Sequence, residues 1–433
     1  MRPSFLPDQF SSRFSALPAF PLVTVCRAAD LVYVADAQFQ PVRLFLAPLY
    51  KGVALMSTPN SPAITVAVAV SGGVDSLCAL VMLRNAGYRV LALHGLFLPN
   101  GPITAPAGLT EACAALGVPL HVADLRAEFE REVLAPFAAS YARGRTPNPC
   151  SYCNRAIKFG VLLDTAQNLG ADKLATGHYA RLVTTPNTGS NDTADVLPLL
   201  AAATDAAKDQ SYFLILVPRQ RLGHALFPLH GQTKDQTRAI VAAAGLAVPL
   251  PSESQDICFA PPVTQPGMSA DEAYRPFLER RWQAAGTIAP GPGPVVLRDA
   301  KGNEREIARH KGLWRYTEGQ RKGLGIAHTE PLFVLAKNSA NNTLVVGPRA
   351  LLGIRRCVTG PANIALPPHL WPDNLLVRLR HRQRPCPASV RVEGGCLHIQ
   401  LDEPQFPTAP GQVAAVYDAD GRVLAAGVVE EMA

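Results

Sequence analysis

A glycine-rich turn at residues 71–76, with the sequence Ser-Gly-Gly-Val-Asp-Ser, constrains the fold of this chain more than any other stretch. It follows residues 64–70, an apolar run rich in β-branched residues that predicts a buried parallel strand. It precedes residues 77–85, which predict a helix that ends at Gly87. In such a strand–turn–helix unit, the backbone N–H groups of the turn and the helix N-terminus favour an anion at one point. We therefore predict a phosphate site, with an ordinary connecting turn as the alternative.

The residue types in the turn suit a nucleotide. Gly72 and Gly73 let a phosphate approach the backbone, Ser71 and Ser76 add hydroxyl donors, and Asp75 can hold a Mg²⁺ ion that bridges phosphates. A Walker-type loop is excluded because no Lys-Ser/Thr pair follows the last glycine. The turn instead resembles the phosphate loop of the PP-loop ATP pyrophosphatases, which cleave ATP to AMP and pyrophosphate. This resemblance implies ATP and Mg²⁺ as cofactors.

Strand and helix patterns alternate after the turn. Residues 89–97 and 119–124 predict further strands, and 109–116 predict a helix between them, which indicates a doubly wound parallel sheet with ligands at the carboxyl ends of its strands. Beyond Pro261, proline and glycine increase, strands shorten and helices nearly vanish. We predict an α/β PP-loop catalytic domain at 61–261, a small β-rich central domain at 262–345 and a C-terminal β-barrel at 346–433.

The first sixty residues fit poorly with this pattern. They are rich in Phe, Pro, Leu and Ala and lack a secretory signal pattern. We interpret residues 1–60 as a disordered extension or an over-long reading frame with Met56 as the true start; an organellar transit peptide is the alternative. No run of about 18 uncharged apolar residues occurs, so we expect no membrane-spanning helix. An odd number of cysteines, nine, favours a reducing compartment, and we expect a cytoplasmic protein.

Positive charge is concentrated in one part of the chain. The net charge is +7, and residues 301–390 hold fifteen Lys and Arg against five Asp and Glu. The rest of the chain is therefore slightly acidic. A basic region in an otherwise near-neutral protein favours a polyanionic partner such as nucleic acid, although a solvated basic face is a common alternative.

Three cysteines are candidates for reactive thiols. Cys150, Cys153 and Cys258 lie in polar stretches that we predict to be loops, where partial exposure and nearby donors can activate a thiol. A structural zinc site is disfavoured because no second Cys-x-x-Cys or His pair lies at a suitable spacing. A thioredoxin-like redox pair is disfavoured because we do not expect Cys150 and Cys153 at a helix start. The cysteines in apolar or strand-like contexts are expected to be core residues: Cys78, Cys113, Cys357, Cys386 and Cys396.

Several motifs occur together in one order. They comprise the turn at 71–76, Gly-Arg-Thr-Pro-Asn-Pro-Cys at 144–150 with Cys-Asn at 153–154, Ala-Thr-Gly-His-Tyr at 175–179, Lys-Asp-Gln-Ser-Tyr-Phe at 208–213 and Ser-Gln-Asp-Ile-Cys-Phe at 254–259. Together with 316–326, 378–383 and 410–412, they resemble the tRNA-specific 2-thiouridylases over about residues 64–431. The chain departs from that family at Glu318, where Ile is usual, at Cys150, where Asp is frequent, and at Leu98-Pro99-Asn100, where Met-Lys-Asn-Trp is usual.

The resemblance implies ATP-dependent 2-thiolation of the wobble uridine of tRNA. AMP would be transferred to the uracil C2 oxygen, and sulfur from a Cys258 persulfide, received from an upstream persulfide or sulfide donor protein, would then attack C2. Cys153 would release sulfide or form a disulfide with Cys258, and Cys150 would stand at the acid/base position. ATP would be held by Ala69, Val70, Ser71, Gly72, Gly73, Val74, Asp75, Ser76, Leu98 and Gly177. The tRNA would contact Asn148, Pro149, Cys150, His178, Lys208, Asp209, Gln210, Arg382, Gln383 and Gln412.

Three alternatives stay open. A [4Fe–4S] cluster on Cys150, Cys153 and Cys258 could carry sulfide in place of a persulfide; we prefer the persulfide and predict no metal site. Another PP-loop adenylating enzyme, such as an amidotransferase-type synthetase, would have an ammonia-supplying domain and no use for Cys258. An RNA-binding protein on an inactive ATP fold is disfavoured by the intact turn and the presence of both Cys153 and Cys258.

Overall fold

The computed structural model describes residues 64–184, 197–249, 257–260, 274–287 and 289–433, and the backbone of three strands near the N-terminus. The chain divides into two compact units, Met1–Pro62 and Ala63–Ala433. In the first unit, β1 (Thr24–Ala28), β2 (Leu31–Ala35) and β3 (Pro41–Val42) pair antiparallel. The remainder of the predicted N-terminal extension lies outside the described residues.

A parallel sheet with the order β10-β7-β4-β5-β6 begins the second unit. Its central strand β4 is the predicted strand before the glycine-rich turn, and its residues are buried because the sheet is covered on both faces. The predicted parallel sheet is therefore confirmed. The strands are β4 (Thr65–Ala69), β5 (Arg89–Leu96), β6 (Leu120–Asp124), β7 (Lys173–Ala175) and β10 (Ala225–Leu226).

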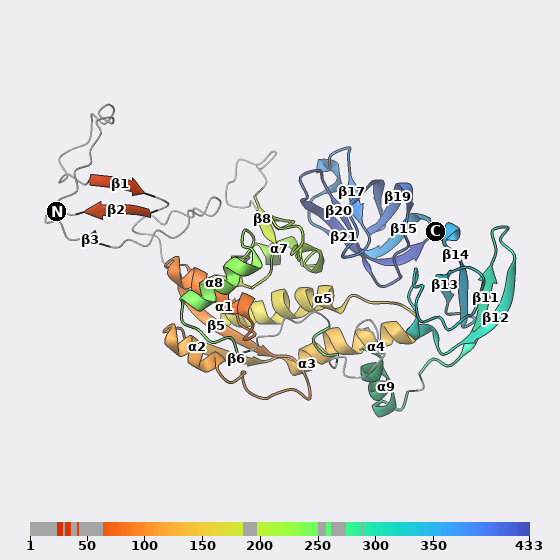
Figure 1. Ribbon diagram of the computed structural model, residues 1–433, viewed down its shortest axis with the longest axis horizontal. Helices are drawn as coiled ribbons and strands as arrows, with labels where there is room; N and C mark the ends of the chain where they lie inside the picture. The colour runs from red at the N-terminus through yellow and green to blue at the C-terminus, as the bar shows by residue number, and fades with distance from the viewer. Residues whose placement is uncertain are drawn as a thin grey trace, which may run out of the picture. The chain divides into compact units, whose positions relative to one another are not determined.

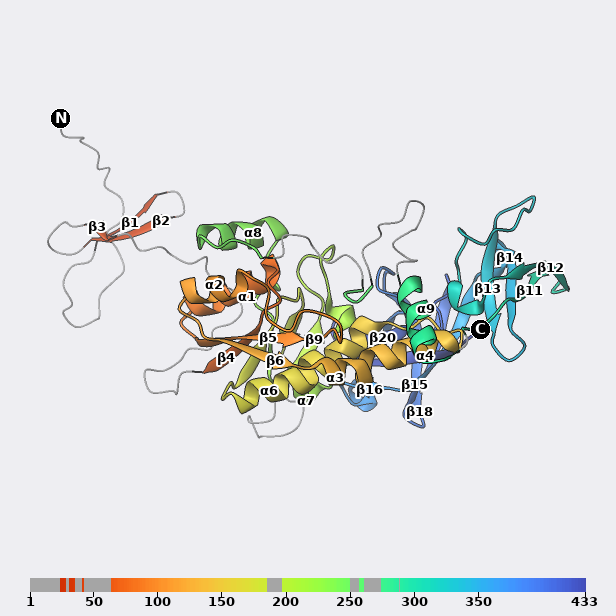
Figure 2. The same ribbon diagram turned by 90° about the horizontal axis from the view of Figure 1, so that it is seen from below.

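Helices cover both faces of this sheet (Figure 2). Val66 and Val68 point to the face formed by α1 (Val74–Asn85), α2 (Leu109–Ala115) and α8 (Lys234–Ala243). Ala67, between them on the strand, points to the other face, because side chains alternate along a strand. That face packs against two helical segments: α3 (Arg126–Phe129), η1 (Glu130–Leu134) and α4 (Ala135–Ala142), and then α5 (Pro149–Tyr152), η2 (Cys153–Leu162) and α6 (Leu163–Asn168).

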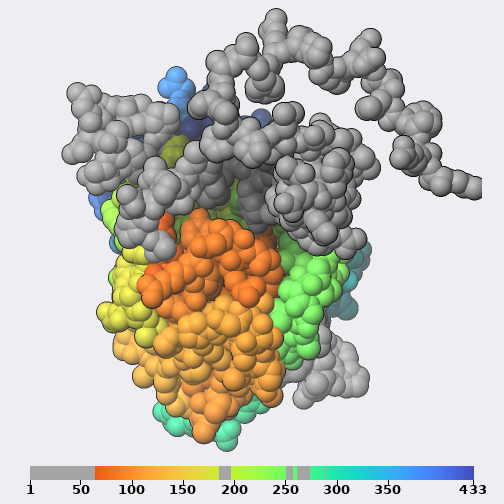
Figure 3. Space-filling model, turned by 90° about the vertical axis from the view of Figure 1, so that its left-hand side faces the viewer, coloured from red at the N-terminus to blue at the C-terminus, as the bar shows by residue number. Residues whose placement is uncertain are grey.

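Short elements follow this layer. A hairpin of β8 (Arg181–Val183) and β9 (Leu199–Ala201) precedes η4 (Ser211–Phe213) and α7 (Arg219–Leu222). Helix α9 (Arg275–Ala284) then leads to the β-rich part of the chain. Figure 3 shows the green atoms of the α8 region beside the orange atoms of the α1 region on one face.

Two β domains complete the second unit (Figure 1). The central sheet has the order β12-β11-β14-β13, and the C-terminal strands close into a six-stranded barrel because β15 pairs with both β19 and β21. The predicted β-rich domain and barrel are therefore confirmed. The central strands are β11 (Gly293–Arg298), β12 (Glu304–His310), β13 (Leu332–Asn338) and β14 (Thr343–Pro348). The barrel contains β15 (Ile354–Pro361), β17 (Leu376–Arg378), β18 (Cys386–Glu393), β19 (Cys396–Gln405), β20 (Val413–Tyr417) and β21 (Val423–Met432), with β16 (Asn363–Ile364) beside β21. Short 3₁₀ turns are η6 (Leu313–Arg315), η7 (Arg349–Leu351) and η8 (Pro368–Leu370).

The barrel shares a core with the parallel-sheet domain. The Tyr212 hydroxyl donates to the Val413 carbonyl at 2.6 Å, and Val413, Ala415 and Tyr417 belong to the same buried cluster as Tyr212 and Leu214. Burying this apolar surface favours a fixed arrangement of the two domains. Among the described residues, no helix is both long and apolar enough to cross a membrane.

Candidate active site

The glycine-rich turn lies at a topological switch point. From β4 the chain runs outward through β5 and β6, and it then returns to place β7 on the other side of β4. Ligands of doubly wound sheets bind outside the carboxyl ends of the strands at such a point. The turn after β4 and the segment Thr176–His178 after β7 flank this position. Leu98, after β5, is partly buried against the sheet's core.

The geometry of the turn explains the glycine at residue 72. Gly72 has a φ of +89°, in the left-handed region that strongly favours glycine. The Ser71 N–H donates to Ser76 Oγ at 3.2 Å, and the Ser76 hydroxyl donates to the Gly73 carbonyl at 2.9 Å. Gly177 closes the site from β7, since a Cβ there would lie 2.8 Å from the Asp75 carbonyl carbon. The structure therefore brings Ala69–Ser76 and Gly177 together, and their contact with ATP stays a prediction.

Asp75 is held by Lys234, which no sequence motif revealed, and by Tyr179 from the motif at 175–179. Lys234, at the start of α8, donates to both carboxylate oxygens at 2.9 Å, and the Tyr179 hydroxyl donates to Oδ1 at 2.9 Å. The Lys234 side chain is 10% exposed, so the pair is shielded from solvent more than an ordinary surface ion pair. A cationic side chain thus lies directly beside the phosphate-binding turn.

The segment that carries Cys150 and Cys153 is helical, so the prediction of a loop was wrong. Helix α5 begins at Pro149, and the Asn148 carboxamide oxygen accepts from the Ser151 N–H at 3.3 Å as an N-cap. Proline is tolerated at the first helical position, because its missing N–H is one that has no helical partner. Cys150 therefore lies in the first turn of a helix, and Cys153 begins a π-helix that runs to Leu162. We disfavoured a thioredoxin-like redox pair because we did not expect these cysteines at a helix start, and that reason no longer holds.

Cys150, Cys153 and Cys258 influence one another's charge. Cys150 and Cys258 are exposed and Cys153 is half-buried, yet removal of water by the surrounding protein raises the pKa of all three thiols. The pKa of Cys153 rises to about 12, mainly through burial, and negative charge on Cys258 and Cys150 contributes a smaller part of this rise. The Lys158 ammonium acts in the opposite direction and lowers the pKa of each. The three predicted thiols thus form one site around a lysine.

Lys158 also connects the thiols to the nucleotide end of the site. Its Nζ lies 3.5 Å from Nε2 of His178, whose Nδ1 lies 2.8 Å from Thr176 Oγ1. Burial, and secondarily Lys158, lower the pKa of His178 well below its ordinary value, so the imidazole is neutral. A neutral His178 can accept a hydrogen bond from Lys158 and leave the ammonium charged.

The position of Lys158 depends on the π-helix. In an α-helix, a residue five positions after Cys153 would lie about 140° around the axis, whereas the i→i+5 hydrogen bonds of a π-helix bring the two residues close to one face. The helical geometry is interrupted by a kink at Gly160, which has φ −98° and ψ −113°. Because no residue pattern predicts π-helical turns, sequence reasoning missed Lys158.

Aromatic residues hold the segment around Cys258. The Phe259 ring lies 5.0 Å from that of Phe137 and 4.9 Å from that of Phe277, between centroids. Phe129 is a third neighbour at 6.2 Å. These edge-to-face and tilted contacts fix the residue next to Cys258 against α3, α4 and α9.

The predicted tRNA contacts lie in several places. Gln383 Oε1 accepts from the Leu379 N–H at 2.9 Å, and Gln412 Nε2 donates to the Thr146 carbonyl at 2.8 Å. Asp209 is buried: it accepts from the Ser211 hydroxyl at 3.0 Å and pairs with Arg378 of the barrel at 3.4 Å. Gln210 Oε1 accepts from the Tyr179 N–H at 3.0 Å. Contact of these residues, Lys208 and the exposed Arg382 with tRNA stays a prediction.

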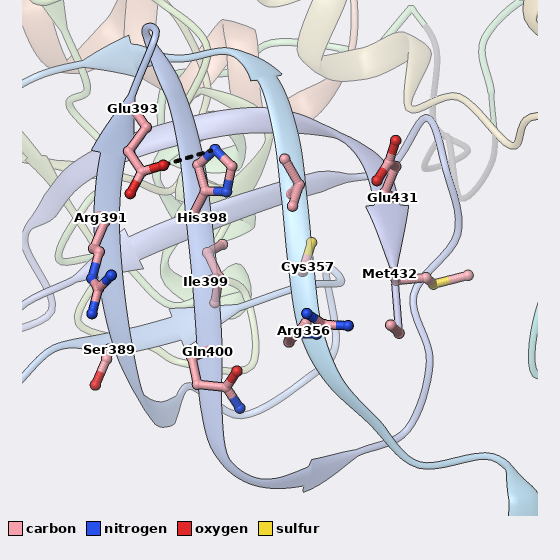
Figure 4. A pocket seen from close by; sticks show the side chains of 12 residues that line it. Arg356, Cys357, Ser389, Arg391, Glu393, His398, Ile399, Gln400, Glu431 and Met432 are labelled. Atoms are coloured by element: carbon pink, nitrogen blue, oxygen red, sulfur yellow. Dashed lines mark ion pairs between the residues drawn. The ribbon is translucent and has the colours of Figure 1, made fainter.

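A cavity of about 530 Å³ lies elsewhere, on the barrel (Figure 4). It is lined by residues of β15, β18, β19 and β21, among them His398 and Glu393, whose nearest nitrogen and oxygen are 4.0 Å apart. None of the predicted site residues lines it. Its charged lining mixes Arg356 and Arg391 with Glu393 and Glu431, so it does not select one sign of ligand charge.

Comparison with known proteins identifies the family. Three family models match in order: "tRNA methyl transferase HUP domain" at residues 64–262, "tRNA methyl transferase PRC-barrel domain" at 285–348 and "Aminomethyltransferase beta-barrel domain" at 365–429. The chain is 47% identical over 370 residues to "tRNA-specific 2-thiouridylase MnmA" of Nitratidesulfovibrio vulgaris (strain DSM 19637 / Miyazaki F), covering 84% of this chain and 98% of the relative. The chain belongs to the tRNA-specific 2-thiouridylase family.

More distant 2-thiouridylases match over the same extent. The protein of Syntrophotalea carbinolica is 40% identical, with 83% of this chain and 97% of the relative covered, and that of Thermosynechococcus vestitus is 38% identical, with 84% and 94% covered. Among solved structures, the U34-tRNA thiolase NcsA from Methanococcus maripaludis with its [4Fe-4S] cluster matches at 17% identity and a TM-score of 0.28, over 51% of this chain and 72% of that one. The resemblance predicted from the motifs is thus confirmed.

Proposed function

We propose that this 2-thiouridylase uses ATP to activate the wobble uridine of tRNA and replaces its C2 oxygen with sulfur. The observation that carries the proposal is the position of Lys158. Its ammonium acts on the three thiols and also contacts His178, in the segment that flanks the glycine-rich turn at the switch point of the sheet. Uracil C2 is a poor electrophile, so adenylation of its oxygen with loss of pyrophosphate supplies a leaving group. Sulfur attack at C2 then expels AMP. We assign residues 61–261 to catalysis, 262–345 to tRNA binding and 346–433 to the barrel.

ATP would bind at residues 69–76, with Leu98 and Gly177 beside it. The left-handed Gly72 and the close approach of Gly177 leave the turn without side chains where the phosphates would lie. A Mg²⁺ ion fits here only in part, because Lys234 already pairs with both oxygens of Asp75. We infer that Lys234 would turn toward the phosphates when Asp75 takes the ion.

Cys258 would carry the transferred sulfur as a persulfide. The terminal sulfur attacks C2 and expels AMP, and Cys153 then attacks the Cys258 sulfur, which forms a Cys153–Cys258 disulfide and frees 2-thiouridine. In the alternative order, Cys153 attacks the persulfide first, which forms the same disulfide and releases sulfide, and this sulfide then attacks C2 and expels AMP. Two electrons from a thiol reductant would restore the cysteines. The flipped uracil would lie beside Asn148, Pro149 and Cys150. The partners would be tRNA and a persulfide donor protein, in the cytoplasm. The Cys258 thiolate would take the outer sulfur of the donor persulfide and leave the donor thiol behind; a sulfide donor would suit only the cluster alternative.

We propose the persulfide route rather than a cluster on Cys150, Cys153 and Cys258. In the described part of the chain, no three His, Cys, Asp or Glu residues are arranged to hold a metal ion. Cys150, Cys153 and Cys258 are near enough to influence one another's pKa but do not form such a group. Iron analysis after anaerobic purification tests this: about four irons per chain, lost in Cys150→Ala, would establish the cluster instead.

The function is tested by incubating the protein with ATP, a persulfide donor and tRNA that bears a wobble uridine. We expect 2-thiouridine, detected by mass spectrometry of the digested tRNA, and its loss in Cys153→Ala and Cys258→Ala. Cys396→Ala is the matched control, because this thiol lies on β19 of the barrel. Unchanged 2-thiouridine in both Cys153→Ala and Cys258→Ala would refute the proposed mechanism.

A further inference from the structure

The central domain contains a buried ion pair that the reaction itself does not use. Glu318 Oε2 lies 3.3 Å from Lys337 Nζ, and the two side chains are 3% and 2% exposed. Burial raises the pKa of Glu318 and lowers the pKa of Lys337, while their mutual attraction opposes both shifts. An apolar pair of similar volume would often serve stability equally well, so a role beyond stability is a reasonable hypothesis.

The ammonium of Lys337 reaches out of its own domain. Besides Glu318, it donates to the Tyr316 carbonyl at 2.9 Å and to Thr146 Oγ1 at 3.2 Å. Thr317 Oγ1 lies 3.3 Å from the same Thr146 hydroxyl. Glu318 therefore holds a lysine whose third bond is to the loop before the cysteine helix.

The barrel holds Thr146 from its other side. The Thr146 N–H donates to the Pro410 carbonyl at 2.8 Å, and its carbonyl accepts from Gln412 Nε2 at 2.8 Å. Gly411 has a φ of +97°, and a Cβ there would lie 3.1 Å from the Thr146 carbonyl group. The backbone of Thr146 is thus fixed by the barrel, and its side chain by the central domain.

Thr146 is two residues before Asn148, which caps the helix of Cys150 and Cys153. Only Pro147, whose φ is restricted, separates Thr146 from Asn148, so a shift of Thr146 would move the capping residue. We propose that Glu318 and Lys337 are positioning residues for sulfur transfer, which hold Thr146 so that the cysteine helix keeps its place when the β domains bind tRNA. This inference rests on the proposed function.

The test compares Glu318→Leu/Lys337→Met with the parent protein and with Thr146→Val. Lys337→Met alone leaves a buried carboxylate unpaired and is expected to lower the melting temperature, whereas the double variant is expected to melt within a few degrees of the parent. Two activities are measured: tRNA-dependent pyrophosphate release, and single-turnover formation of 2-thiouridine. The matched control is Asp164→Leu/Arg221→Met, which removes a half-exposed ion pair between α6 and α7.

We expect the double variant to keep pyrophosphate release and the KM for tRNA within twofold of the parent. Its rate of 2-thiouridine formation should fall at least tenfold, because a small misplacement of reacting groups is costly. Thr146→Val should likewise slow 2-thiouridine formation and keep pyrophosphate release near the parent rate. The control pair should change neither activity. If the parent forms 2-thiouridine and the folded double variant forms it at the same rate, the inference is wrong. A parent that forms none overturns the proposed function and this inference with it.

Discussion

At the scale of the residue, Lys158 is the group that most affects the reactivity of the thiols. Its ammonium lowers the pKa of Cys150, Cys153 and Cys258 against the effect of burial. Lys158→Gln should raise these pKa values, because the cation that favours the thiolate is lost, and should therefore reduce the thiolate fraction at neutral pH. Because a thiolate of higher pKa is also more nucleophilic, alkylation by iodoacetamide should slow by about threefold. Mass spectrometry of the Cys153 and Cys258 peptides measures the rates.

Two variants separate the charge of Lys158 from its packing. Lys158→Arg keeps the cation and should alkylate at nearly the parent rate. Arg155 is an exposed cation on the same helix, and its guanidinium carbon lies 5.7 Å from the Tyr152 ring centroid. Arg155→Gln should leave the alkylation rate unchanged. Equal alkylation rates in Lys158→Gln and the parent would contradict the electrostatic role.

The pH dependence of Cys153 gives a separate prediction. Burial raises its pKa to about 12, and only the thiolate reacts, so alkylation of the free protein should be slow at neutral pH. The rate should increase about tenfold per pH unit between pH 7 and pH 9, because both values lie below the pKa. A plateau within this range, in a pH series on the folded protein, would place the pKa near neutrality.

At the scale of the element, local patterns predicted the sheet but not the cysteine helix. The strand–turn–helix unit at 64–85 depends on the local backbone preferences of β-branched residues and glycines. Its elements β4 and α1 therefore form as predicted. Pro147 and Pro149 favoured a loop, but the Asn148 side chain starts a helix at Pro149. The π-helical turns that place Lys158 leave no periodic signature.

The Asn148 cap can be tested by hydrogen exchange. Asn148→Ala removes the acceptor of the Ser151 N–H and should destabilise the start of α5 by about 1 kcal/mol. Amides in peptides covering residues 149–162 should then exchange about fivefold faster, provided that they exchange by local opening. Asn148→Ser keeps a capping oxygen and should exchange at close to the parent rate. Equal protection in the alanine variant would show that tertiary contacts, rather than the cap, hold this helix.

At the scale of the whole molecule, part of the basic charge has a structural role. Lys337 pairs with Glu318 inside the central domain, and Arg378 pairs with buried Asp209 and lies 5.1 Å from the Tyr212 ring centroid. Neither contact could be read from the sequence, because the Arg378–Asp209 bond joins residues 169 positions apart and the Lys337–Thr146 bond joins residues 191 apart. A charge count over 301–390 therefore overstates the surface available to tRNA.

The exposed remainder of this charge predicts how tRNA binding responds to salt. Lys and Arg contacts with phosphates release counterions, so the affinity should fall by about a thousandfold between 50 and 200 mM salt if about six contacts form. Arg382→Gln, at an exposed position of the barrel, should weaken binding and reduce the slope of log affinity against log salt by about one contact. Arg238→Gln, on α8 of the parallel-sheet domain, should leave the slope unchanged. Fluorescence anisotropy with labelled tRNA measures both quantities. A flat salt response in the parent would exclude phosphate contacts as the main source of affinity and leave base and shape recognition by the β domains to account for binding.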